Sequence, residues 1–152
     1  MQRFTYPLNC NEILRKRKSL RKDLITKENL IKKKVAILGG STTSEIKNIL
    51  DLFLLDIGVE AEFYESDYNL FYEEAVFPNQ SLEEFKPDLI YIHTTNKNIS
   101  TFPRSNNNEN EVKKLLNNEI DKFKSIWIAL AKYGCPIIQN NLVPVLVDVN
   151  LS

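Results

Sequence analysis

The chain has 152 residues, of which 43% are hydrophobic and 26% are charged, as is typical of a single globular domain with its own core. No apolar run approaches the ~20 residues of a membrane span, and the first residues lack the layout of a signal peptide, so we expect a cytoplasmic protein without a membrane partner. The two cysteines, Cys10 and Cys135, have no partners at metal-ligand spacing, so no metal site is expected, and Cys135 is predicted to pack as a small hydrophobe.

The formal net charge of zero hides a strong asymmetry. Residues 1–34 carry 11 Lys and Arg against 3 Asp and Glu, whereas residues 35–152 carry 9 against 17. We therefore predict two parts: a basic N-terminal arm over 1–34, helical over 10–31, and an α/β domain over 35–152. The cations proposed for partner binding are Arg15, Lys16, Arg17, Lys18, Arg21 and Lys22.

Three interpretations of the basic arm stay open. It is a solvated helix that complements the acidic body of its own fold, or a docking face for an acidic partner such as a carrier protein or a phosphorylated ligand, or a nucleic-acid contact. The last is disfavoured because no aromatic residues interleave with the basic ones.

The segment after the arm has the pattern of a strand, a tight turn and a helix. Four apolar residues at 35–38 run into Gly39 and Gly40, and a hydroxyl cluster then leads into apolar residues at helical spacing. This pattern predicts a buried parallel strand over 35–38 and a helix over 42–57 that ends at Gly58.

The remaining elements follow in alternation. We predict a strand over 59–65, an Asx-type turn over 66–69, short helical segments at 70–77 and 82–85, a strand over 89–93, a helix over 111–133 and a strand over 136–139. Residues 142–149 are apolar again. The loop at 94–110 contains six Asn residues, and its length is typical of a functional lid or a mobile segment.

Because strands alternate with helices four times, we predict an α/β fold of three layers. Its mostly parallel, four-stranded sheet has the order 2-1-3-4 and helices on both faces. The glycine turn and His93 then lie at one carboxyl edge, where open α/β sheets carry their sites. The polar residues expected there are Ser41, Thr42, Thr43, Asp67, His93, Thr94, Thr95, Asn96, Asn140 and Asn141.

The chemistry of that edge leaves alternatives open. The glycine turn lacks the Lys of a P-loop and the third glycine of a dinucleotide fingerprint, so its hydroxyls either bind a ligand or cap the helix. Ser41 is placed like a nucleophile, and the single histidine, His93, is the ordinary candidate base. Asp67 orients His93 only if the turns after the second and third strands approach each other.

Five stretches form a combination that spans nearly the whole chain: residues 13–18, 35–43, 63–69, Lys86-Pro87-Asp88 before a strand, and 134–141. This combination resembles the N-terminal, SGNH-hydrolase-like domain of FkbH-like proteins, in subfamily IIIC of the haloacid dehalogenase (HAD) superfamily. The resemblance implies an SGNH-like α/β fold that is followed in the family by a HAD-like domain.

The resemblance also implies a function. Family members load a glycerate-derived three-carbon unit onto an acyl carrier protein, in polyketide and surface-polysaccharide pathways. Their Asp-x-Asp nucleophile motif, with its Mg²⁺, belongs to the HAD-like domain. Residues 148–150 read Asp-Val-Asn, so we expect that domain to be absent here and no cofactor in this one.

Residue by residue, the resemblance places Ser41 at the family nucleophile, with Gly39-Gly40 in place of Gly-Asp, and Asn96 or Asn140 at the oxyanion asparagine. The terminal Asp-x-x-His of active SGNH enzymes is missing. We therefore expect a non-catalytic or weakly catalytic support domain whose basic arm contacts an acidic acyl carrier protein or the HAD-like domain. The alternatives are a serine esterase or deacylase that uses Ser41 and His93, and a purely structural domain. The substrate-binding residues expected are Gly39, Gly40, Thr42, Thr43, Asp67, Asn96, Asn140 and Asn141.

Overall fold

The computed structural model describes residues 3–142. Along the chain the elements are α1 (Cys10–Leu24), β1 (Ile31–Gly39), α2 (Ser44–Asp56), β2 (Val59–Glu65), α3 (Phe71–Val76), α4 (Gln80–Phe85), β3 (Leu89–His93), η1 (Asn96–Asn98), α5 (Glu109–Leu130), η2 (Ala131–Tyr133) and β4 (Ile137–Gln139). The apolar segment predicted at 142–149 lies outside the described residues except for its first residue, Leu142.

The four strands form one parallel sheet in the order β2-β1-β3-β4, which confirms the predicted topology. β1 is central and pairs on both sides, so that Val35 lies opposite Phe63 of β2 and Leu89 of β3. At the carboxyl edge Gly39 lies opposite His93. This register brings the ends of the two strands together.

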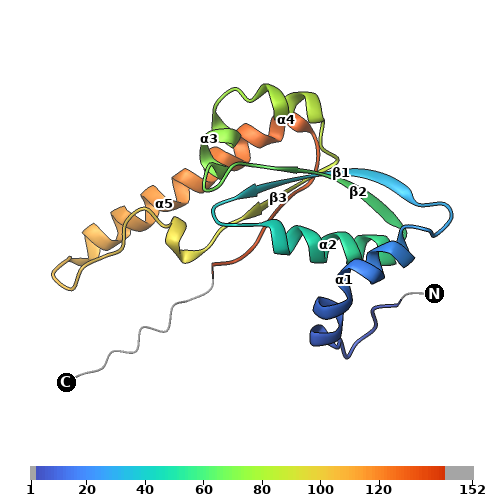
Figure 1. Ribbon diagram of the computed structural model, residues 1–152. Helices are drawn as coiled ribbons and strands as arrows, with labels where there is room; N and C mark the ends of the chain where they lie inside the picture. The colour runs from blue at the N-terminus through green and yellow to red at the C-terminus, as the bar shows by residue number, and fades with distance from the viewer. Residues whose placement is uncertain (1–2, 143–152) are drawn as a thin grey trace, which may run out of the picture.

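Helices cover both faces of the sheet, as predicted (Figure 1). On one face, α3, α4 and α5 pack over Ala36, Leu38, Ile90 and Ile92, which are all fully buried. On the other face, α1 packs against α2, and their buried side chains form a second, smaller core. Both cores are built by amphipathic helices that turn their apolar faces inward, as the helical spacing of apolar residues predicts.

The arm helix is shorter than predicted. It ends at Leu24 rather than at 31, and the following turn, with Asn29 at φ +61°, leads into β1 at Ile31. The lysines at 32–34 therefore belong to the exposed first half of β1. Lys32 and Lys34 lie opposite Glu60 and Glu62 of β2. Cross-strand pairs of opposite charge stabilise such an exposed strand end.

The Asn-rich segment is built from caps and turns. The Thr95 and Asn98 side chains form a capping box around η1, and Asn108 forms another with Glu111 at the start of α5. Between them, Asn107 Oδ1 accepts from the Arg104 N–H at 2.6 Å. Asparagine is frequent here because its amide satisfies backbone groups that turns and helix ends leave unpaired.

Within residues 3–142, no helix combines the length and the apolar character needed to cross a membrane.

Candidate functional site

The glycine turn after β1 is bonded to the ends of both neighbouring strands. The Gly39 N–H donates to Ser66 Oγ at 2.8 Å, and the Gly40 N–H donates to the His93 carbonyl oxygen at 2.8 Å. Ser41 therefore lies at the same sheet edge as His93, as the predicted topology requires.

Both glycines are required by close contacts, since neither has a positive φ. A Cβ on Gly40 would lie 2.5 Å from the amide atoms of Asn98, and a Cβ on Gly39 would lie 2.8 Å from the carbonyl oxygen of Ser41. The turn thus has no room for a side chain at either position.

Asn98 ties three turns together, and sequence reasoning missed it. Its Nδ2 donates to the Gly40 carbonyl at 2.7 Å and to Asn69 Oδ1 at 2.9 Å, while its Oδ1 accepts from the Thr95 N–H at 2.7 Å. The turns after β1, β2 and β3 therefore meet at this one amide. The Thr95-x-x-Asn98 spacing of a capping box was the available signal, although it does not foretell the bond to Gly40.

The side chain of Asn140, one of the two asparagines predicted after β4, is fully engaged in hydrogen bonds within the protein. Asn140 Oδ1 accepts from the Thr94 N–H and its Nδ2 donates to the Thr94 carbonyl, both at 2.8 Å. Thr94 is only 1% exposed, so Asn140 supplies the bonds that a further strand residue would supply. Asn96 begins η1 and Asn141 is exposed beside Asn140.

The hydroxyl cluster divides into buried and exposed members. Thr43 occupies the N-cap position of α2, but its Oγ1 donates to Glu65 Oε2 at 3.0 Å and forms no cap bond with the helix. Lys47 pairs with the same carboxylate, so Glu65 joins the start of α2 to the end of β2. Ser41 is half-buried and Thr42 is exposed. The expectation that these hydroxyls cap the helix is therefore wrong for Thr43.

Tyr91 lies next to the candidate base. Its hydroxyl is 3.2 Å from His93 Nδ1, and both side chains lie on the face of β3 opposite the buried Ile92. Burial lowers the pKa of His93 and raises that of Tyr91, so near pH 7 the imidazole is neutral and the phenol is protonated. His93 thus has the protonation state of a base.

A proton relay is not assembled around His93 in the described part of the chain. Within residues 3–142, no hydrogen bond joins His93 to Ser41 or to Asp67. Asp67 is exposed, and its N–H donates to Glu74 Oε1 at 2.8 Å. The structure brings Ser41 and His93 to one edge, but their side chains do not form the bonded pair that nucleophilic catalysis uses.

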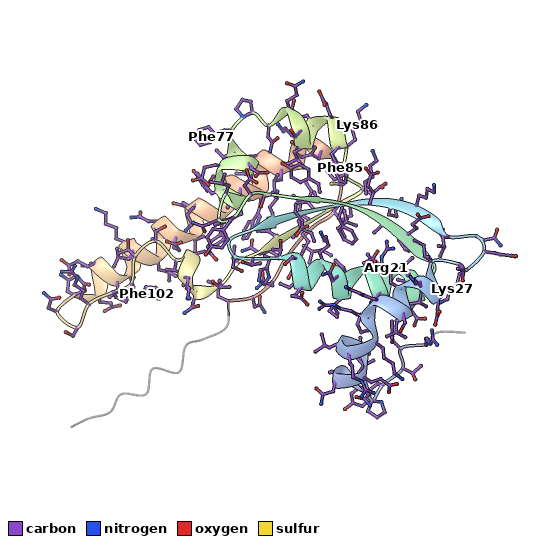
Figure 2. The ribbon with its side chains drawn as sticks, viewed as in Figure 1. Arg21, Lys27, Phe77, Phe85, Lys86 and Phe102 are labelled. Atoms are coloured by element: carbon purple, nitrogen blue, oxygen red, sulfur yellow. The ribbon has the colours of Figure 1, made fainter. Side chains whose placement is uncertain are left out.

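The basic arm separates into inward and outward cations. Arg21 Nε lies 2.6 Å from Asp51, and Arg17 pairs with Glu45, so both reach α2 (Figure 2 labels Arg21 beside that helix). Lys16 pairs with Glu12 on its own helix at 2.7 Å.

The other three cations are Arg15, Lys18 and Lys22. They are exposed, and within residues 3–142 they form no ion pair. Their spacing of three and four residues places them on one side of α1. We call these three residues the outer basic face.

An apolar cavity of about 560 Å³ lies beside the carboxyl edge of the sheet, next to Asn140. It is lined by α5, by residues of the segment 99–103 and by Asn140, Asn141 and Leu142, but not by Ser41 or His93. Sequence reasoning missed it, because its walls come from distant parts of the chain.

The cysteines and acidic residues form no metal cluster in the region that the structure covers, where three or more His, Cys, Asp or Glu side chains nowhere gather. Cys135 is partly buried against the larger core, and burial raises the pKa of its thiol. Cys10 is exposed.

Comparison with known proteins gives one solved structure with a similar fold. No protein-family model and no curated protein matches this chain. The solved structure is the crystal structure of the N-terminal part of the protein BF1531 from Bacteroides fragilis, which contains a phosphatase domain complexed with Mg. The TM-score is 0.66 at 21% identity over 88% of this chain. The match spans only 35% of the BF1531 chain, about a third of its length.

Proposed function

We propose that this chain is the SGNH-like N-terminal domain of an FkbH-like protein. In this proposal it supports the transfer of a three-carbon glyceryl unit to an acyl carrier protein by docking the carrier, without catalysing the transfer. The sequence resemblance supports the family, and the fold shared with the N-terminal part of a phosphatase-domain protein is compatible with it. Polyketide or surface-polysaccharide biosynthesis is the setting that the resemblance implies.

The observation that carries this proposal is the outer basic face. Arg17 and Arg21 neutralise carboxylates of α2, whereas Arg15, Lys18 and Lys22 remain exposed on one side of α1. A cluster of like charges on a rigid helix attracts an acidic partner over about one Debye length, ~10 Å at 0.1 M salt. An acidic carrier protein fits this face.

The carboxyl edge favours support over catalysis. The amides of Asn98 and Asn140 and the hydroxyl of Thr43 already bond to the protein. Side chains that already bond to the protein in this way hold the ends of the strands and their turns in place, and they are not available to stabilise a transition state. The serine esterase remains the alternative, because Ser41 and the neutral His93 share an edge.

Charge reversal on α1 tests carrier docking. In the full chain, we expect Arg15→Glu with Lys18→Glu and Lys22→Glu to weaken binding of a bacterial holo acyl carrier protein about tenfold or more at low salt. Three attractions of roughly 0.2–1 kcal/mol each become repulsions, and 1.4 kcal/mol corresponds to tenfold. Isothermal titration calorimetry at several salt concentrations measures the effect.

The matched control carries the same change in net charge elsewhere. Lys97→Glu with Lys114→Glu and Lys124→Glu alters three exposed lysines away from α1, and we expect less than a threefold change in affinity. Equal losses in both variants, or an affinity for the wild-type chain that does not depend on salt, would contradict docking at the outer basic face.

A further inference from the structure

The apolar cavity beside the carboxyl edge is a groove that runs along α5, and it shares no residue with the outer basic face. The N-terminal half of α5 extends beyond the sheet (Figure 1), and residues of the segment 99–103 form the opposite wall. Figure 2 labels Phe102 in that wall. The volume of about 560 Å³ lies within the roughly 300–1,000 Å³ that is typical of sites for small molecules.

The groove is long, and most of its length is apolar. Along α5 its lining reaches from Val112 to Trp127, which are 15 positions apart, or about 22 Å at the helical rise of 1.5 Å. Exposed fractions of 59% for Leu116 and 40% for Ile120 leave these two side chains open to a ligand. The residues of α5 that line the groove are Val112, Leu115, Leu116, Glu119, Ile120, Phe123 and Trp127.

Polar contacts hold the two walls together. The Ser100 N–H donates to both carboxylate oxygens of Glu119, at 3.2 and 3.1 Å. Lys122 Nζ pairs with Glu119 and donates to the Asn98 carbonyl oxygen at 2.6 Å and to Ser100 Oγ at 2.9 Å. Because these bonds fasten the segment 98–100 to α5, the groove is formed before a ligand enters it.

Uncharged amide groups gather at one end of the groove. There Gln139 Oε1 accepts from Trp127 Nε1 at 2.7 Å, and Asn140 and Asn141 complete the lining. The Asn140 amide is bonded to Thr94, whereas Asn141 is exposed. The other end, at Val112, is apolar, so the groove offers hydrogen bonds to only one end of a ligand.

The charge of the lining selects the kind of head group. Among the described residues that line the groove, Glu119 is the only charged one, and Lys122 balances its charge. A carboxylate or phosphate head would therefore find no cation in this lining, and an unpaired charge is costly to remove from water. An uncharged hydroxyl or ester head can hydrogen-bond to an amide such as that of Asn141.

We infer that the groove along α5 binds a small, uncharged amphiphile with a single unbranched aliphatic chain. Its polar head lies at Asn141 and its chain runs past Ile120 toward Val112. Carbon–carbon bonds of about 1.5 Å give an extended chain roughly 1.3 Å per methylene, so about 22 Å accommodates up to roughly 16 carbons. The inference goes beyond the proposed function and does not depend on it.

A series of alcohols tests the site in the full chain. We expect decan-1-ol to bind saturably and to shift the emission of Trp127, the only tryptophan, to shorter wavelength, because the ligand covers a half-exposed indole. From butan-1-ol to decan-1-ol, affinity should rise at least about twofold for each added methylene, since burying a methylene is favourable. Fluorescence titration and isothermal titration calorimetry measure both effects.

Decanoate tests the preference for an uncharged head, since it has the same number of carbons and is anionic at pH 7. We expect it to bind the wild-type chain at least about tenfold more weakly than decan-1-ol. Asn141→Lys introduces a cation at the amide end of the groove. It should strengthen decanoate binding about threefold and leave decan-1-ol binding within about twofold.

Two aspartate variants of α5 locate the chain. Ile120→Asp introduces a charge into the groove and should weaken decan-1-ol binding about tenfold or more. The matched control is Ile128→Asp, at a side chain that is 75% exposed and does not line the groove, and we expect a change of less than about twofold. Circular dichroism checks that each variant keeps its helical content.

Four results would overturn the inference. The first is no saturable binding of decan-1-ol up to its solubility limit, or an affinity that does not depend on chain length. The second is an equal loss of binding in Ile120→Asp and Ile128→Asp. The third is decanoate binding as tight as that of decan-1-ol, or unchanged in Asn141→Lys. The fourth is Trp127 emission that changes with protein concentration in the absence of ligand, together with a dimer in sedimentation, which would assign the groove to a second copy. None of these measurements involves a carrier protein, so they are independent of the docking experiment.

Discussion

Among single residues, the contact between Gly40 and Asn98 joins the three turns of the carboxyl edge. The Asn98 amide donates to the Gly40 carbonyl oxygen and fills the space where a Cβ at Gly40 would lie. A methyl group there must displace the amide and break its bonds to Asn69 and Thr95 as well.

We therefore expect Gly40→Ala to lower the free energy of unfolding by about 1–3 kcal/mol through overpacking and lost hydrogen bonds. We expect Asn98→Ala alone to lower the free energy of unfolding by a similar amount. The double variant is expected to lose less than the sum, by at least about 0.5 kcal/mol, since alanine at 98 makes room for the new methyl group. Urea denaturation of the four proteins measures this coupling.

Gly39→Ala, alone and combined with Asn98→Ala, is the control for this double-mutant comparison. Its Cβ meets the carbonyl oxygen of Ser41 at 2.8 Å, which belongs to the backbone, so Asn98→Ala brings no relief. Strictly additive losses for Gly40→Ala and Asn98→Ala would show that the two residues do not share the space.

Among the elements, the attachment of the N-terminal segment to α2 depends on one buried carboxylate. Asp56, the last residue of α2, accepts from the backbone N–H groups of Arg3 and Phe4 at 2.8 Å and from Lys27 Nζ at 3.1 Å. Burial alone would raise its pKa, but these hydrogen bonds and the Lys27 charge outweigh burial and lower the pKa below 3.8. An acidic residue at a helix C-terminus is otherwise unfavourable, so these partners explain its presence.

Asp56→Asn should lower the free energy of unfolding by about 1–3 kcal/mol at pH 7, because the amide cannot accept from all three donors. The folded-state pKa is below the unfolded value. The stability from ionised Asp56 is therefore present above pH 3.8 and is lost as the pH falls through the folded-state pKa. The difference in the free energy of unfolding between the wild-type chain and the variant should become smaller from pH 7 to pH 3, as measured by urea denaturation.

Asp67→Asn, at an exposed carboxylate, is the control and should change stability by less than about 0.5 kcal/mol. If Asp56→Asn lowers the free energy of unfolding by the same amount at every pH down to 3, the pKa of Asp56 is not lowered in the folded state.

Across the whole molecule, the connections that follow the four strands meet at one edge of the sheet. The turns after β1, β2 and β3 share Asn98, and the residue after β4 holds Thr94. The apolar groove lies beside this arrangement rather than at Ser41.

We expect Ser41→Ala to leave the hydrolysis of a chromogenic ester by the full chain within about twofold of the wild-type rate, because His93 makes no bond to Ser41. Ser44→Ala, at the exposed start of α2, is the control. A large loss with Ser41→Ala alone would favour the esterase. In that case the rate should rise with pH through a His93 pKa below 6.5, since the base must be neutral.

The sequence by itself determined the elements and the topology. Strand bounds at 59–65 and 89–93 were predicted as observed, and the 2-1-3-4 order followed from alternating strands and helices. Helical and strand periodicity are local properties of the chain, and parallel connections obey few rules. The basic helix was predicted for the same reason, but its end was placed at residue 31 and lies at Leu24. Residues 31–34 were assigned to the arm, yet they begin β1, where Lys32 and Lys34 lie opposite Glu60 and Glu62 of β2.

Only the tertiary structure decided which polar side chains form hydrogen bonds or ion pairs within the protein and which remain exposed. Asn98 and Asn140 look alike in sequence, yet one joins three turns and the other holds Thr94. Likewise Arg17 and Arg21 are paired while Lys18 is not. A hydrogen bond or ion pair depends on positions in space within about 3 Å of each other, and residues far apart in the chain reach that distance only after folding. The groove along α5 has the same origin, because its walls meet only in the folded chain.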